Sequence, residues 1–216
     1  SRLTENNLIF ASSFTYTKST KTDFLDKSFS IFKTKLESAG NVLSLISRLK
    51  NEELNANGNR TFLDVEYSQY VKTELDFIKH WDFGAKSVIA MRSFFGIAIP
   101  YGNSDNIPFS RSYFGGGSND NRAWQSYDLG PGRSGGTNDF NEANMKIAFS
   151  TEYRFNIVGK WNGAFFADAG NIWNVLDNVE DERFTFNGIE SLKDIALGTG
   201  LGIRYDFNFF IFRTDL

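Results

Sequence analysis

Long stretches of this chain alternate between apolar and polar residues. In residues 62–82 the odd positions include Val65 and Val71, whereas the even positions include Glu74 and Asp76. A period of two indicates a β-strand with one apolar face and one polar face. Read as a single strand, this segment would extend roughly 70 Å at about 3.3 Å per residue. Strands of soluble domains seldom exceed about ten residues.

The same alternation recurs along most of the chain, with residues 144–158 and 193–206 as clear examples. It predicts an all-β fold with about eight antiparallel strands. We place them near residues 7–20, 28–40, 62–82, 86–101, 144–158, 163–175, 193–206 and 208–216.

The connections between these strands alternate between short and long. The short ones are 21–27, 83–85, 159–162 and the stretch around 207, and the long ones are 41–60, 102–140 and 176–192. A soluble sandwich and a transmembrane barrel both produce two-faced strands. Long strands, many aromatic residues and alternating loop lengths favour an outer-membrane barrel, which has short periplasmic turns and long extracellular loops.

Composition removes several classes of function. Among 216 residues there is no cysteine and one histidine, and the net charge is −3. A disulfide framework and a thiolate metal site are therefore excluded, and no strong positive field points to nucleic acid. No window of about 18 uncharged apolar residues predicts a transmembrane helix. The opening SRLTENN lacks the pattern of a signal peptide, so we expect a mature chain or an internal fragment.

One segment departs from the β pattern. In residues 41–51, Val42, Leu45, Ile46 and Leu49 fall on one helical face. We expect a short amphipathic helix in an extracellular loop. Its apolar face could sense lipid, but packing against the barrel is the favoured interpretation.

The longest connection, 102–140, contains the most unusual residues. Three successive glycines, Gly115, Gly116 and Gly117, precede an arginine, Arg122. Loops of this length in compact domains are usually functional or disordered, and the glycines allow close approach of the backbone.

The order of short and long connections indicates whether all strands of the barrel are present in this sequence. Eight strands with short first and last connections place both chain ends on the long-loop side. Bacterial single-chain barrels place both ends on the short-turn side, so we expect at least one further strand before residue 1 and one after Leu216.

Three segments resemble the BamA/TamA superfamily of outer-membrane insertases and translocators. They are FGGGSNDNRAWQSYDLGPG (114–132), FSTEYRFNI (149–157) and FFADAGNIWN (165–174), and the end of the chain from 198 looks like late barrel strands. The resemblance implies strands eight to fifteen of a sixteen-stranded barrel, with residues 1–216 forming part of the barrel domain.

The resemblance also implies that loop 102–140 folds into the lumen, where its arginine pairs with acids of the inner wall. The family motif valine-arginine-glycine-aromatic reads Asn121, Arg122, Ala123, Trp124 here. This departure looks closer to TamA-like relatives of the Bacteroidota.

Strand parity supplies partners for Arg122. Glu152 and Asp168 both fall on the polar, inward parity of their strands, and a confined carboxylate pair requires a compensating cation. The alternative is that both acids face lumen water. We take the loop motif as Gly115, Gly116, Gly117, Arg122, Trp124, Gly130 and Pro131, and its lumen partners as Glu152, Asp168, Gly170, Gly198, Gly200 and Gly202.

The three glycines at 198, 200 and 202 share the inward face of one strand. They indicate either a thin or bent strand or a groove that holds another backbone. The groove is the favoured interpretation, and we expect the folded-in loop to occupy it.

Four functions are compatible with a barrel of this kind. The resemblance implies an outer-membrane assembly or insertion factor that acts without covalent chemistry on nascent outer-membrane proteins, in contact with outer-membrane lipid and with periplasmic or inner-membrane assembly subunits. The alternatives are a two-partner-type secretion pore, a passive porin and a barrel enzyme using His80, which we instead expect beside Trp81 at the lipid boundary.

No cofactor, metal or nucleic acid is expected. An acidic cluster lies in a predicted loop, but its spacing matches no EF-hand-type loop, so we expect a solvated loop tip. Its members are Asp177, Glu180, Asp181 and Glu182.

Overall fold

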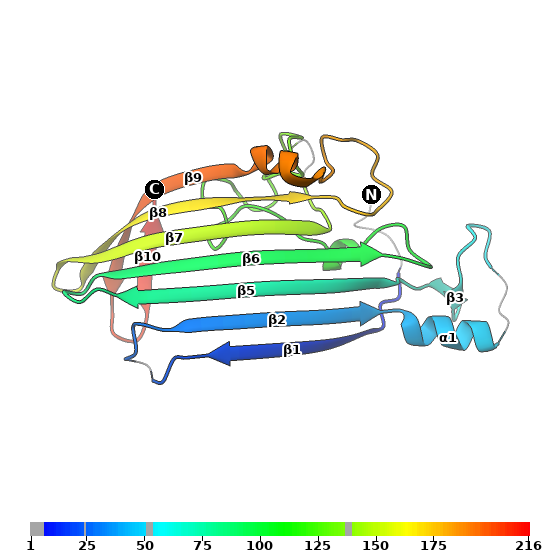
Figure 1. The fold of residues 1–216 in the computed structure, drawn as a ribbon, viewed down its shortest axis with the longest axis horizontal. Helices are drawn as coiled ribbons and strands as arrows, with labels where there is room; N and C mark the ends of the chain where they lie inside the picture. The colour runs from blue at the N-terminus through cyan, green and yellow to red at the C-terminus, as the bar shows by residue number, and fades with distance from the viewer. Residues whose placement is uncertain (1–6, 24, 51–53, 137–139) are drawn as a thin grey trace.

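The computed structural model describes residues 7–23, 25–50, 54–136 and 140–216. Eight strands form one sheet in the order β1-β2-β5-β6-β7-β8-β9-β10, and every neighbouring pair is antiparallel (Figure 1). The strands are β1 (Ala11–Ser19), β2 (Ser30–Ala39), β5 (Tyr70–Asp82), β6 (Val88–Pro100), β7 (Met145–Val158), β8 (Trp161–Trp173), β9 (Ala196–Asp206) and β10 (Ile211–Asp215).

The remaining elements lie in the connections. They are α1 (Asn41–Leu49), the two-stranded hairpin of β3 (Thr61–Phe62) and β4 (Val65–Glu66), and the 3-10 helices η2 (Phe109–Arg111) and η3 (Gly188–Asp194). Long and short connections alternate as expected. All long connections therefore leave from one end of the sheet, as Figure 1 shows.

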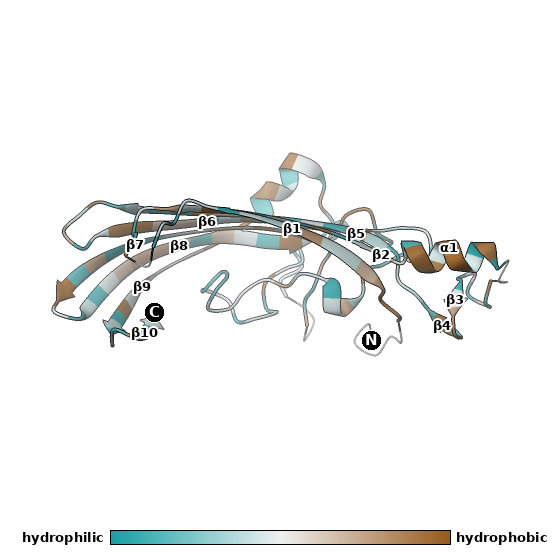
Figure 2. Ribbon diagram, turned by 90° about the horizontal axis from the view of Figure 1, so that it is seen from below, coloured by the Kyte–Doolittle hydropathy of each residue, from teal (hydrophilic) through white to brown (hydrophobic). Residues whose placement is uncertain are grey.

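The sheet is curved rather than flat. Seen from its edge it forms an arch, and irregular segments lie beneath the concave side (Figure 2). Among the described residues, β1 and β10 each pair with a single strand of the sheet. This confirms the all-β prediction and gives the arc expected of an antiparallel barrel wall.

The register of the sheet sorts side chains onto two faces. Phe149 lies opposite Ala169 and Tyr153 opposite Phe165, all on the convex face, whereas Glu152 lies on the concave face. Large exposed apolar side chains cover the convex face. They include Val71, Leu75, Phe77, Trp81, Phe149, Tyr153, Phe165, Leu197, Leu201, Ile203 and Phe212.

The prediction of one strand over 62–82 was wrong. Leu63 and Asp64 adopt positive φ angles of 53° and 61° and reverse the chain. Residues 61–66 therefore form the separate β3–β4 hairpin, and β5 begins only at Tyr70. Alternation continues through a tight two-residue turn, so the pattern alone did not reveal the break.

The predicted helix is present as α1, but its packing differs from the expectation. Val42, Leu45 and Leu49 are 50%, 60% and 75% exposed, whereas the buried side chains are Leu43, Ser44 and Ser47. The small serine face lets the β3 backbone approach, and Ser47 Oγ donates a hydrogen bond to the Thr61 carbonyl at 3.4 Å. Among the described residues, no helix is long and apolar enough to cross a membrane.

The expected pairing of His80 with Trp81 is also wrong. Adjacent residues of a strand point to opposite faces, and the register places Trp81 on the convex face and His80 on the concave face. His80 instead stacks on Phe29, with ring centroids 4.4 Å apart.

The two faces can be tested by single cysteines, because the chain has none. We expect Phe149→Cys to carry a spin label that oxygen dissolved in the bilayer relaxes strongly. The adjacent Ser150→Cys should instead respond to a water-soluble nickel complex, because it faces the concave side. Equal responses of the two labels to both reagents would contradict the assignment of faces.

Candidate functional site

The connection between β6 and β7, residues 101–144, forms a folded loop. Antiparallel bridges join Tyr113 to Ala143 and Gly115 to Leu129, so the loop pairs with itself before it reaches its tip. Asn121 Nδ2 then donates to the Ala196 carbonyl on β9 at 3.1 Å. The loop is therefore attached to the concave face of the sheet rather than extended into solvent.

Arg122 lies at the centre of this attachment. Its Nε and Nη2 donate to the two carboxylate oxygens of Asp168, at 2.7 and 2.8 Å, and its backbone N–H donates to Asp168 Oδ2 at 3.1 Å. Its Nη1 donates to Glu152 Oε2 at 2.8 Å. This planar, two-point bond to a carboxylate is the geometry that a guanidinium provides and an ammonium cannot.

The contact is withdrawn from water. The side chains of Arg122, Asp168 and Glu152 are 8%, 1% and 7% exposed. Burial acts to lower the pKa of Arg122, but the hydrogen bonds that it donates to Asp168 and Glu152 outweigh burial, so that pKa lies above its ordinary value. The guanidinium also lies 3.7 Å from the ring centroid of Phe166, a favourable cation–π distance.

Sequence reasoning missed the members of this cluster that β9 and β10 supply. Arg204 Nη2 donates to Glu152 Oε2 at 2.7 Å. Asp215 accepts from Arg122 at 3.4 Å and forms an ion pair with Arg213 at 3.3 Å. On β7, Arg154 Nε also donates to Glu152 Oε1. We call Arg122, Glu152, Arg154, Asp168, Arg204, Arg213 and Asp215 the latch cluster.

The inward parity of Arg204 could have revealed its membership. Asp215 could not be found in that way, because its position depends on how the short strand β10 registers against β9. Arg213 also reaches the loop directly, since its Nη2 donates to the Ser118 carbonyl at 2.6 Å.

The loop glycines shape the backbone beside Arg122. Gly116 has φ +89°, and a Cβ there would lie 2.1 Å from the Gln125 carbonyl oxygen; Gly117 has φ +106°. Gly115 is in contact with Leu129, and Gly130, with φ +79°, packs against Asn171. The Gly130–Pro131 peptide is cis. Gly115, Gly116 and Gly117 therefore let the loop fold closely on itself, and Gly130 lets it approach β8.

Trp124 belongs to the loop, whereas Gly170 lies within the sheet. Trp124 lies in the same turn as Arg122 and accepts a backbone hydrogen bond from Gly117 at 2.8 Å. Gly170 lets β7 and β8 approach, because a Cβ there would be 2.8 Å from the Ile147 carbonyl oxygen.

The three inward glycines of β9 do not form one groove for the loop. Only Gly198 meets the loop, where an added Cβ would lie 2.7 Å from Ala123 Cβ. An added Cβ at Gly200 would meet the Leu216 carbonyl oxygen and the Phe166 ring, and one at Gly202 would meet Asp215. The expectation was therefore too broad: the glycines make room for the loop, for the ring beneath Arg122 and for β10 in turn.

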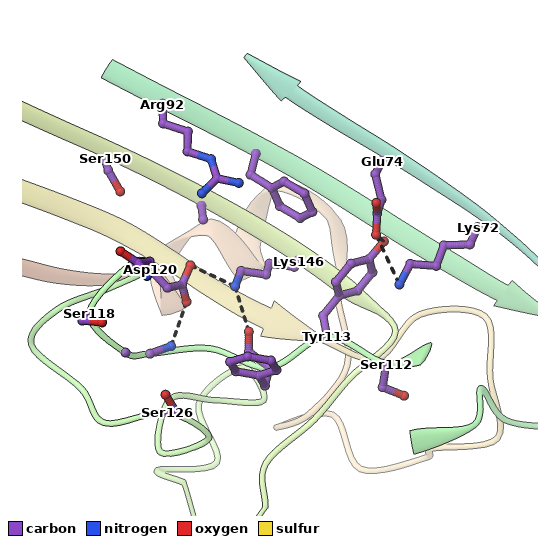
Figure 3. Close-up of a pocket in the computed structure, with 16 residues that line it drawn as sticks. Lys72, Glu74, Arg92, Ser112, Tyr113, Ser118, Asp120, Ser126, Lys146 and Ser150 are labelled. Atoms are coloured by element: carbon purple, nitrogen blue, oxygen red, sulfur yellow. Dashed lines mark hydrogen bonds and ion pairs between the residues drawn. The ribbon is translucent and has the colours of Figure 1, made fainter. Parts of the chain in front are cut away.

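A cavity of about 420 Å³ separates the loop from β5, β6 and β7 (Figure 3). Its charged groups are paired. Lys146 forms an ion pair with Asp120 at 2.9 Å, and Lys72 forms one with Glu74 at 3.2 Å. Tyr113 OH donates to Glu74 at 3.2 Å, and burial, followed by the charge of Glu74, raises the pKa of Tyr113. Contacts between loop and sheet thus lie on both sides of this cavity, from Asp120 to Lys146 on β7 and from Tyr113 to Glu74 on β5.

The acidic segment near residue 180 is not part of this site. Asp181 accepts a hydrogen bond from Arg183 Nη2 at 2.6 Å, and hydrogen bonds from the Arg183 side chain and backbone lower the pKa of Asp181 to about 2. In the parts of the chain that the structure covers, no group of three or more His, Cys, Asp or Glu side chains could hold a metal ion.

Comparison with known protein families gives one result that bears on this arrangement. Residues 54–216 match the Omp85 superfamily domain. The matched range includes the whole 101–144 loop and every residue of the latch cluster.

We expect Arg122→Ala to release the loop from the sheet. The substitution leaves the buried Asp168 without its cation, and breaking a buried ion pair costs about 3–5 kcal/mol. Hydrogen exchange of the Gly117 amide, which donates to the Trp124 carbonyl, should accelerate accordingly.

The matched control is Arg111→Ala in the same loop. Arg111 is 39% exposed and lies 3.4 Å from the buried Glu37. Glu37 keeps Lys35 at 2.8 Å and the Tyr70 hydroxyl at 2.7 Å when Arg111 is removed, so the cost should be well below that at Arg122. Similar acceleration in the two variants would contradict the special role of Arg122.

Gly198→Val should also displace the loop, because the new side chain would overlap Ala123. Thr199→Val, whose side chain lies on the convex face, serves as the control. Valine favours strands, so β9 itself should persist while limited proteolysis cuts the loop faster. Intact loop resistance in Gly198→Val would contradict this contact.

Proposed function

We propose that this chain, which belongs to the Omp85 superfamily, is part of an outer-membrane barrel that assists the insertion of nascent outer-membrane proteins. The observation that carries the proposal is the latch cluster. It holds a long loop against the inner face of the wall through one buried guanidinium and two carboxylates. A loop held in this way cannot move independently of the strands that form the inner wall.

The convex face supports a membrane setting. Its apolar side chains are exposed, while charged side chains lie on the concave face beside the loop. In the hydrocarbon core of a membrane every backbone polar group needs a partner. The sheet edges at β1 and β10 must therefore pair with further strands when the wall lies in lipid.

The proposed action requires no covalent step. An exposed strand edge can template an incoming strand through main-chain hydrogen bonds. The latch would keep the rest of the wall in register while an edge opens. The partners are then outer-membrane lipid and nascent barrel proteins at the cell outer membrane, together with periplasmic or inner-membrane assembly subunits.

The loop favours insertion over one of the two alternatives, the passive porin. A passive porin needs an open, stable constriction, whereas here a glycine-rich loop is attached at several points of the inner face. A polypeptide-secreting pore could use the same loop as a plug, so this alternative is separated by experiment.

The test is insertion of a client barrel protein, diluted from urea, into liposomes that contain the protein. We expect wild type and Arg111→Ala to speed appearance of the folded, heat-modifiable client band relative to empty liposomes. Arg122→Ala should lose most of that acceleration, because the loop is no longer fixed to the wall.

The proposal would be overturned if the client folds no faster in liposomes that contain the wild-type protein than in empty liposomes. Transfer of a soluble polypeptide into the liposome interior, without any client insertion, would instead favour the secretion pore.

A further inference from the structure

The helix α1 exposes one apolar face, although the chain folds closely around its other side. Val42, Leu45 and Leu49 are spaced by three and four residues and therefore lie on the same side of the helix. They are 50%, 60% and 75% exposed within the part of the chain that the structure describes. Single exposed apolar residues are ordinary, but a contiguous group of them marks a surface that meets a partner.

The position of β3 shows which way this face points. Ser47, on the other side of the helix, is buried and donates to the Thr61 carbonyl of β3 at 3.4 Å. In Figure 2, β3 and β4 lie below α1, on the concave side of the arch. The apolar face of α1 is consequently turned toward the side of the molecule on which the convex face of the sheet lies.

The direction of α1 is fixed at its first residues. Gly40, the one residue between β2 and α1, has φ +76°, and an added Cβ there would overlap the Ser68 carbonyl oxygen. Tyr101, which follows β6, donates its hydroxyl to Asn41 Oδ1 at 2.8 Å. The helix is therefore held to the ends of the strands and continues from β2, as Figure 1 shows.

The apolar face of α1 extends the surface of the sheet that faces lipid. Leu36 of β2 and Val71 of β5 are 49% and 42% exposed, and the register places both on the convex face. Because α1 begins directly after β2 and turns its apolar face to the same side, the lipid-facing surface continues onto the helix. It does so at the end of the sheet from which the long connections leave.

The size and charge of this face suit a lipid surface better than a protein. Three exposed apolar side chains are far fewer than the roughly 20–30 residues that each partner contributes to a stable protein interface. The helix NVLSLISRL contains no acidic residue, and Arg48 is exposed in its last turn. Amphipathic helices with cationic side chains lie in the membrane interface, where the cations attract anionic headgroups.

We propose that α1 docks on the outer leaflet of the membrane and binds phosphate-bearing lipid. Val42, Leu45 and Leu49 would enter the acyl boundary, and Arg48 would lie beside the headgroup phosphates. The proposal rests on the membrane setting proposed above for the convex face. The docked helix would hold the connection between β2 and β5 in the lipid interface.

This contact would also affect the loop that carries Arg122. Asn103, near the start of the 101–144 loop, donates to the carbonyls of Arg60 and Tyr67, both at 2.9 Å. Both acceptors belong to the connection that α1 begins. Lipid bound at α1 would therefore restrict the outer end of that loop, while the latch cluster holds its tip.

The position of α1 is tested with spin labels on the whole protein in phosphatidylcholine vesicles. Oxygen and a neutral nickel complex together report the depth of a label. We expect the label at Leu45→Cys to lie about 5–10 Å below the polar surface, the depth of interfacial helices. Phe149→Cys and Ser150→Cys provide the lipid and water references from the two faces of β7.

Each other outcome of the label experiment contradicts the docking. A water-like label at Leu45, with a lipid-like label at Phe149, overturns the docking and leaves the membrane setting intact. Low accessibility of Leu45 to both reagents means that protein covers the helix, and this overturns the docking equally. Water-like labels at both positions overturn the docking together with the membrane setting.

The headgroup contact is tested by hydrogen exchange of peptides covering residues 41–50. Adding anionic phosphatidylglycerol to the vesicles should slow this exchange about fivefold, the effect of one cation near an anionic surface. Arg48→Gln should abolish the difference between the two kinds of vesicle. It should leave exchange in pure phosphatidylcholine unchanged, because arginine and glutamine have similar helix propensities.

Lys193→Gln is the matched control, since it removes the same charge from an exposed residue of η3 in another long connection. This variant should keep the response to phosphatidylglycerol. Equal exchange of the wild-type peptides in the two kinds of vesicle overturns the binding of phosphate-bearing lipid. Loss of the response in Lys193→Gln as well as in Arg48→Gln means that net charge alone acts, and overturns it equally.

Discussion

The arrangement of this molecule depends on one buried guanidinium. Arg122 satisfies both oxygens of Asp168 and one oxygen of Glu152 in a region from which water is largely excluded. Two carboxylates on adjacent strands would repel each other in such a place. Glu152 is also paired with Arg154 and Arg204 of the sheet itself, whereas the cation beside Asp168 comes from the loop. The position of the loop is therefore coupled to the burial of Asp168 on β8.

The latch cluster extends this coupling to β9 and to β10, the last strand of the sheet. Arg204 shares Glu152 with Arg122, and Asp215 carries the contact to β10. The inward glycines of β9 create the space in which these groups meet. A short strand with few ladder bonds is thereby tied to the same point as the loop. Movement of β10 and release of the loop should consequently occur together.

The sequence predicted the parts of this account that follow from period two. Alternation assigned Glu152, Asp168 and the β9 glycines to the inward face, and the register agrees. It failed where the chain reverses without interrupting the alternation, as at Leu63 and Asp64. Alternation could not predict the contacts of Asp215, because they depend on how β10 registers against β9. It also could not predict which face of α1 is buried, because that depends on which neighbouring segment covers the helix.

The central claim is that Arg122 and Asp168 stabilise the docked loop as a pair. The most direct measurement is a double-mutant cycle with Arg122→Ala, Asp168→Ala and the double variant, using hydrogen exchange of the Gly117 amide to measure the free energy of loop opening. The account predicts a coupling energy of about 1–3 kcal/mol, with the second substitution costing little once the first is made. Additive effects, within about 0.5 kcal/mol, would show that the two residues act independently and would contradict the latch.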